Sequence, residues 1–183
     1  MSITVIYSDF GDTDTQVLTT LWENALDVNL IHITRNTRDV QNKIKKAMVA
    51  EKDTLLLCGH GTPDGLLAPT WEVLVGEHNI HYIKAKRVIG VWCYAAQFAE
   101  SVGLKGFFTS MFISNPTEAK LAKCFNSNAE VITQQEILFC QRMNQLILGN
   151  TPMTQWRESL CVQADMSIDV VKYNYGGLRC FSF

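Results

Sequence analysis

Two residues that can pair as nucleophile and general base, Cys93 and His60, each end a short apolar run of the chain. The first run is TLLLC and stops at Gly59-His60-Gly61, and the second is RVIGVW and stops at Cys93. The reactive form of cysteine is the thiolate, which a neighbouring imidazole or a helix N-terminus stabilises. If the fold brings these two residues together, their types predict covalent catalysis by a thiol.

The elements that must position this pair alternate between strand and helix patterns. We expect strands at residues 3–9, 28–34, 54–60, 87–93 and 106–114. The last three are almost continuously apolar, which is typical of strands covered by helices on both faces. Helices are expected at residues 11–26, 36–50, 94–103, 116–124 and 131–148, with Thr37 as the N-cap of the second because its hydroxyl can accept backbone N–H groups.

This alternation predicts an α/β fold, a three-layer α/β/α sandwich with a mostly parallel central sheet. Extra C-terminal helices follow, and the last stretch, IDVVKYNYGGLRCF, predicts a terminal strand or hairpin. The length of 183 residues fits one domain, with a core at 1–116 and a helical and strand extension at 117–183.

Ligands of such sheets collect beyond the carboxyl ends of the strands. Asp9 and Asp12 lie at the end of the first expected strand, His60 at the end of the third and Cys93 at the end of the fourth. If the third and fourth strands are neighbours, His60 and Cys93 face each other at one edge of the sheet. Gly61 lets the backbone approach closely, so its N–H and that of Cys93 are predicted to form an oxyanion hole.

The order of these blocks, TLLLCGHG and then VIGVWC, resembles the caspase-like (clan CD) cysteine peptidases, most closely the separase and CHAT-type members. The resemblance covers about residues 1–116 and implies a caspase-like domain with a Cys93/His60 dyad and no cofactor. It also implies a protein or peptide substrate. Residue 91, where several members carry an acidic or amide side chain that contacts the P1 residue, is Val91 here, so Val91 is a candidate substrate-binding residue that would make one wall of the P1 pocket neutral.

In that family the loop after the first strand lines the P1 pocket, so Asp9 and Asp12 are candidate substrate-binding residues that would favour a basic P1 side chain. Two other readings of this acidic loop stay open. Aspartate is common at turns and helix caps, and the stretch VIYSDFGDTDTQV faintly resembles a flavodoxin phosphate loop. Against a flavodoxin-like FMN protein, carboxylates repel phosphate. A non-catalytic caspase-like binding module is the other alternative.

The remaining features narrow the class of protein. A net charge of -2 gives no basic footprint for nucleic acid, and no apolar run is long enough to span a bilayer, so we expect a soluble, cytoplasmic protein. His78 and His81 lack a third ligand nearby, so no metal site is predicted. The oligomeric state stays open, and the other cysteines are expected to pack in the interior.

Overall fold

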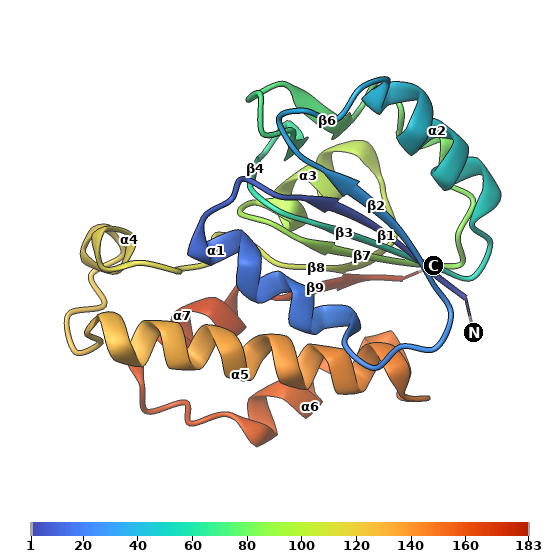
Figure 1. Ribbon diagram of the computed structural model, residues 1–183. Coiled ribbons are helices and arrows are strands. Elements are labelled where there is room, and N and C mark those ends of the chain that lie inside the picture. The colour runs from blue at the N-terminus through green and yellow to red at the C-terminus, as the bar shows by residue number, and fades with distance from the viewer. Residues whose placement is uncertain (1, 183) are drawn as a thin grey trace.

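A six-stranded sheet in the order β2-β1-β3-β7-β8-β9 forms the centre of the computed structural model, which describes residues 2–182 (Figure 1). The first five strands of that order pair in parallel, and β9 is antiparallel to β8. The strands are β1 (Ile3–Ser8), β2 (Val28–Ile33), β3 (Thr54–Cys58), β7 (Arg87–Val91), β8 (Gly106–Phe108) and β9 (Arg179–Phe181). The predicted α/β class with a mostly parallel sheet is therefore confirmed.

Helices cover both faces of this sheet, because neighbouring residues of each buried strand point to opposite sides. In β1, Val5 and Tyr7 pack into one hydrophobic cluster and Ile6 into the other. The first cluster joins the sheet to η1 (Val17–Trp22), α5 (Ala129–Leu148), α6 (Trp156–Gln163) and α7 (Asp169–Gly176). The second joins it to α2 (Val40–Ala50) and α3 (Ala95–Val102), on the opposite side in Figure 1.

A small antiparallel sheet, which the sequence did not predict, follows directly after His60. It consists of β4 (Gly61–Thr62), β5 (Gly65–Leu67) and β6 (Val73–Gly76). The hydroxyl of Ser8, at the end of β1, donates to the carbonyl of Leu67 at 2.6 Å, and the N–H of Leu67 donates to the carbonyl of His60 at 2.9 Å. These bonds tie His60 to β5, and β5 to the end of β1.

Several expected elements were wrong in extent. The helix expected at 11–26 is a short α1 (Thr13–Gln16) followed by the 3-10 helix η1, and α2 starts at Val40 after Asp39, so Thr37 is not its N-cap. The Thr37 hydroxyl instead accepts the N–H of Thr34 at 2.8 Å, which closes the turn before the helix. The strand expected at 106–114 ends at Phe108.

The C-terminal extension contains the helices α4 (Pro116–Leu121), α5 and α6, as the sequence predicted. The last stretch is not a hairpin: it is α7 followed by the terminal strand β9. Two 3-10 turns complete the elements, η2 (Ile80–Tyr82) and η3 (Met153–Gln155). Within residues 2–182, no helix is both long and apolar enough to cross a membrane.

Candidate active site

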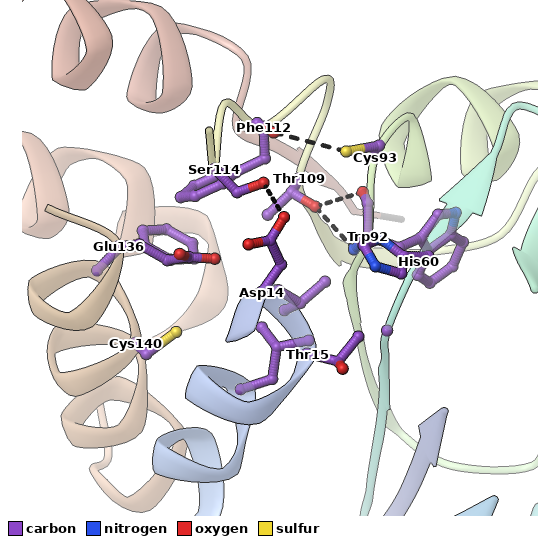
Figure 2. A pocket seen from close by; sticks show the side chains of 14 residues that line it. Asp14, Thr15, His60, Trp92, Cys93, Thr109, Phe112, Ser114, Glu136 and Cys140 are labelled. Carbon is purple, nitrogen blue, oxygen red and sulfur yellow. Dashed lines mark hydrogen bonds between the residues drawn. The ribbon is translucent and has the colours of Figure 1, made fainter. Parts of the chain in front are cut away.

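His60 and Cys93 lie at the same edge of the sheet because β3 and β7 are parallel neighbours. Cys58 and Val91 pair with each other at the ends of these strands. His60 lies two residues after Cys58, and Cys93 lies two residues after Val91. Both line a cavity of about 40 Å³, drawn in Figure 2. The convergence that the sequence predicted for neighbouring strands is therefore present.

The glycines around His60 are required by close packing. Gly59 has a φ of +146°, and a Cβ there would stand 2.7 Å from the carbonyl oxygen of Ser8. A Cβ on Gly61 would stand 1.9 Å from Cδ1 of Trp92. Gly61 is not among the described residues that line the cavity, whereas Gly59 is. The oxyanion role of the Gly61 and Cys93 N–H groups stays a prediction.

His60 is held by a carboxylate, because its Nε2 lies 2.7 Å from Oδ2 of Asp12. The other oxygen of Asp12 accepts the N–H of Thr15 at 2.8 Å and thereby caps α1. Burial of Asp12 opposes its ionisation, but the hydrogen bonds from His60 and Thr15 outweigh this and lower its pKa. Since the ionised carboxylate only accepts, Nε2 carries the hydrogen, and Nδ1 of the neutral ring can take up a proton.

Cys93 lies on a sharp turn from β7 into α3. The next residue, Tyr94, has a left-handed φ of 72°, a strained conformation for a residue other than glycine. Thr109 secures the turn: its hydroxyl accepts the N–H of Trp92 at 3.1 Å and donates to the Trp92 carbonyl at 2.7 Å (Figure 2). The Thr109 carbonyl accepts the N–H of Ala96 at 2.8 Å. Thr109 therefore fixes the backbone on both sides of Cys93.

The surroundings of Cys93 favour its protonated thiol. Burial, with the nearby carboxylates of Glu118 and Asp14, raises its pKa to about 11. Its Sγ lies 3.5 Å from the carbonyl oxygen of Phe112 and donates to it. The sequence predicted the opposite direction, a thiol pKa lowered by His60 and by the N-terminus of α3. Burial is the largest cause of the opposite shift, and the carboxylates that add to it come from elements far from Cys93 in the chain.

These carboxylates form an acidic group beside the thiol. The Ser114 hydroxyl donates to Oδ2 of Asp14 at 2.7 Å, and the Ser114 N–H donates to Glu118 at 2.9 Å. Glu136, on α5, lines the same cavity and is only 8% exposed. Its burial, with Asp14 and Glu118 nearby, raises its pKa to about 8.

The predicted substrate-binding residues are divided between different places. Val91 lines the cavity, and Asp12 is bound to His60. Asp9 lies 2.8 Å from Nε2 of His32, on the β2 side of β1, and is not among the described lining residues. An acidic wall is present, but Asp14 and Glu136 supply it.

Glu136 was missed although the sequence carried a signal for it. The buried residues of α5 recur at helical spacing, and they are Ile132, Glu136, Phe139, Cys140, Met143, Leu146 and Ile147. A glutamate within such an apolar stripe indicates a buried carboxyl, and buried carboxyls are uncommon unless a partner or a function requires them.

The loop after β1 offers little to a phosphate. The N–H of Gly11 donates to Asp9 at 2.8 Å and the N–H of Thr15 to Asp12, so backbone donors that an anion needs are occupied. For metals, residues 2–182 contain no group of three or more histidine, cysteine, aspartate or glutamate residues that could hold an ion.

Neither the protein-family models nor the curated proteins contain a match to the chain.

Proposed function

We propose that the protein is a caspase-like cysteine endopeptidase that acts through Cys93 and His60. One observation carries the proposal: a cysteine and a carboxylate-bound histidine lie at the ends of adjacent parallel strands and line one cavity. Cysteine, base and the group that orients the base are the three parts that nucleophilic catalysis by a thiol uses. The resemblance of the blocks TLLLCGHG and VIGVWC to clan CD supports the same reading.

The chemistry starts from a protonated thiol. As Sγ of Cys93 bonds to the substrate carbonyl carbon, the imidazole of His60 takes the thiol proton, and Asp12 stabilises the resulting imidazolium. The tetrahedral intermediate collapses with cleavage of the C–N bond, and His60 passes its proton to the leaving amine. Water then attacks the thioester, with His60 as base, and releases the acid product and the free thiol.

A non-catalytic caspase-like binding module is the second candidate, and one observation favours it. The thiol of Cys93 has a raised pKa and donates to the Phe112 carbonyl, which is the state of a structural cysteine. In such a module the cavity would bind a peptide without cleaving it.

Peptide turnover separates the two candidates. Fluorogenic peptides with arginine, lysine, aspartate or leucine before the scissile bond are incubated with the protein and with Cys93→Ala and His60→Ala. The endopeptidase predicts cleavage that Cys93→Ala abolishes and His60→Ala slows by about 10²-fold or more, the usual scale for a general base. Binding of a peptide without cleavage would favour the module, and cleavage that survives in Cys93→Ala would reject the proposed nucleophile.

A further inference from the structure

Strand β2 is an open edge of the central sheet. It stands first in the strand order and pairs on one side only, with β1, along its six residues. Asn29, Leu30 and His32 are exposed, and Leu30 keeps 43% of its surface accessible. An edge strand offers a row of backbone N–H and C=O groups that can pair with a strand of another chain.

The usual protections of an edge strand are missing from β2. Proteins protect edges with lysine, proline, a bulge, a very short strand, or a covering helix or loop. The sequence of β2 is VNLIHI, with neither lysine nor proline, and its register with β1 has no bulge. At the opposite edge, β9 has only three residues and begins with Arg179. Of the two edges, β2 is therefore the one suited to pairing.

The bonds to β1 define which backbone groups of β2 point outward. The carbonyl of Asp27, just before the strand, accepts the N–H of Ile3 at 3.0 Å. The carbonyl of Ile33, at its end, accepts the N–H of Asp9 at 2.9 Å. Successive residues of a strand bond to alternate sides, so residues 27, 29, 31 and 33 bond to β1. Residues 28, 30 and 32 direct their N–H and C=O groups outward, where no other strand pairs with β2 within residues 2–182.

The outward row ends at His32, because the backbone of Thr34 is already used. The N–H of Thr34 donates to the Thr37 hydroxyl at 2.8 Å, and its carbonyl accepts the Thr37 N–H at 3.0 Å. The outward groups of β2 are thus those of Val28, Leu30 and His32 alone.

An antiparallel second copy of β2 pairs all of these groups in one register. In that register Leu30 faces Leu30 of the second copy, and Val28 faces His32 at both ends. Each facing pair exchanges two backbone hydrogen bonds. A shift by two residues would place Val28 opposite Thr34 or His32 opposite Leu26, outside the strand, and would leave outward groups unpaired.

The charges that flank β2 favour the same antiparallel arrangement. Residues 23–27 contain Glu23 and Asp27 and no basic residue, whereas residues 34–38 contain Arg35 and Arg38 and no acidic residue. All four of these side chains are exposed. An antiparallel copy brings the acidic end of each strand beside the basic end of the other, whereas a parallel copy would bring like charges together.

We propose that the protein forms a two-fold symmetric dimer through β2, with Leu30 of the two chains facing each other at the axis. The interface is closed, because both chains contribute the same strand and no β2 edge remains for a third chain. The inference goes beyond the proposed function and does not use the catalytic role of Cys93. One pair of strands buries a small area, so we expect a dissociation constant of about 1–100 micromolar.

Sedimentation velocity of the full chain, from about 1 to 300 micromolar, measures this dimer. Leu30→Lys should weaken dimerisation by at least about 10-fold, because two ammonium groups then face each other at the axis. Lysine is common on natural edge strands, so the thermal midpoint of the monomer should be retained. Leu121→Lys is the matched control, the same change at a leucine on α4 that is 80% exposed, and should leave the dimer unchanged.

A cysteine at position 30 tests the register. The Cα atoms of a facing pair that exchanges backbone bonds lie about 5.5 Å apart, within the range that a disulfide spans. Leu30→Cys should therefore give a covalent dimer with oxidised glutathione, which takes up the two electrons and two protons of the joined thiols. Leu121→Cys should give none above the background of the original chain, in which Cys161 and Cys180 are partly exposed.

Three results would overturn the inference. The first is a chain that stays monomeric up to about 300 micromolar, and the second is a dimer that Leu30→Lys leaves unchanged. The third is a set of assemblies that grow beyond the dimer with concentration, since these indicate open pairing of β2 with a different edge. A dimer that forms no cross-link in Leu30→Cys would reject the two-fold axis at Leu30. Each of these results leaves the peptidase proposal untouched, because none of them measures cleavage.

Discussion

Asp12 links His60, the proposed general base, to helix α1. One carboxylate oxygen of Asp12 lies 2.7 Å from Nε2 of His60, and the other caps α1. A second pair of the same kind joins Asp9, in the same loop, to His32 on β2 at 2.8 Å, on the side of β1 away from β3 and β7. The chain therefore contains its own matched control for the Asp12–His60 pair.

Asp12→Asn should lower kcat by about 10²- to 10⁴-fold, because the amide no longer stabilises the imidazolium that forms on His60. KM should stay near its original value, since Asp12 is not among the described residues that line the cavity. Asparagine caps helices about as well as aspartate, so the thermal midpoint should change little. Steady-state kinetics and thermal unfolding of this variant measure all three.

Asp9→Asn is the control and should leave kcat unchanged. Equal losses in both variants would show that the loop responds to any missing carboxylate, and would contradict the orienting role of Asp12. A loss in Asp9→Asn alone would instead support the sequence prediction that Asp9 binds substrate.

The stability of the protein should fall as pH rises through neutrality because of Glu136. Its folded pKa of about 8 lies above its ordinary value of 4.5, so the folded chain binds more protons than the unfolded chain between these two pH values. The contribution of neutral Glu136 is thus fully present below about pH 4.5 and is lost as pH rises to about 8. The loss is at most about 5 kcal/mol, at about 1.4 kcal/mol for each pKa unit.

Glu136→Gln should remove this fall, because glutamine has no proton to lose and nearly the same shape. Urea unfolding at pH 5, 7 and 9 compares the variant with the original chain and with Glu130→Gln, a change of an exposed residue on the same helix. The expected result is a stability gain in Glu136→Gln that grows with pH. A constant difference across the three pH values would show that the Glu136 carboxyl does not titrate in this window.

Thr109 and Thr54 form a matched pair of fully buried threonines. The Thr109 hydroxyl bonds to both the N–H and the carbonyl of Trp92, whereas the Thr54 hydroxyl has no partner among the described residues. Thr109→Val should therefore cost about 1–3 kcal/mol, since it removes the partner of the buried Trp92 N–H, whereas the Trp92 carbonyl keeps its bond from the N–H of Ala95. Thr54→Val should be neutral or stabilising, because it removes a buried hydroxyl that makes no bond.

Chemical denaturation measures both threonine variants, and kcat is the second readout. Because Thr109 fixes the turn that carries Cys93, we expect kcat to fall in Thr109→Val and to stay unchanged in Thr54→Val. Similar stabilities for the two variants would mean that the hydroxyl bonds of Thr109 contribute little to the turn.

The sequence predicted the α/β class and the placement of His60 and Cys93 at one edge of the sheet, because continuous apolar runs and the order of strands are local signals. It did not predict that Asp12 binds His60 or that Glu136 lines the same cavity as Cys93, since these arrangements join residues far apart in the chain through the packing of α1 and α5 on the sheet. The short sheet β4–β6 was also missed, because its strands are too short to show a periodic pattern.

The direction in which the pKa of the Cys93 thiol is shifted could not be predicted from the sequence either. A nearby histidine and a following helix were visible in the sequence and predicted a lowered value. Burial and the carboxylates of Glu118 and Asp14, which raise it, depend on tertiary contacts. The prediction that Thr37 is the N-cap of the second helix was wrong for a related reason. Both Thr37 and Asp39 can cap a helix, and the geometry of the turn decides between them.

The central claim is that Cys93 is the nucleophile, and covalent labelling tests it most directly. The protein is treated with a peptidyl acyloxymethyl ketone that carries lysine at P1, and the adduct is counted by intact mass and located by peptide mapping. Five other free cysteines compete, of which Cys161 and Cys180 are partly exposed. The account predicts one adduct, on Cys93, that is absent from Cys93→Ala and forms about 10²-fold or more slowly in His60→Ala. Labelling of another cysteine, undiminished in Cys93→Ala, would contradict it.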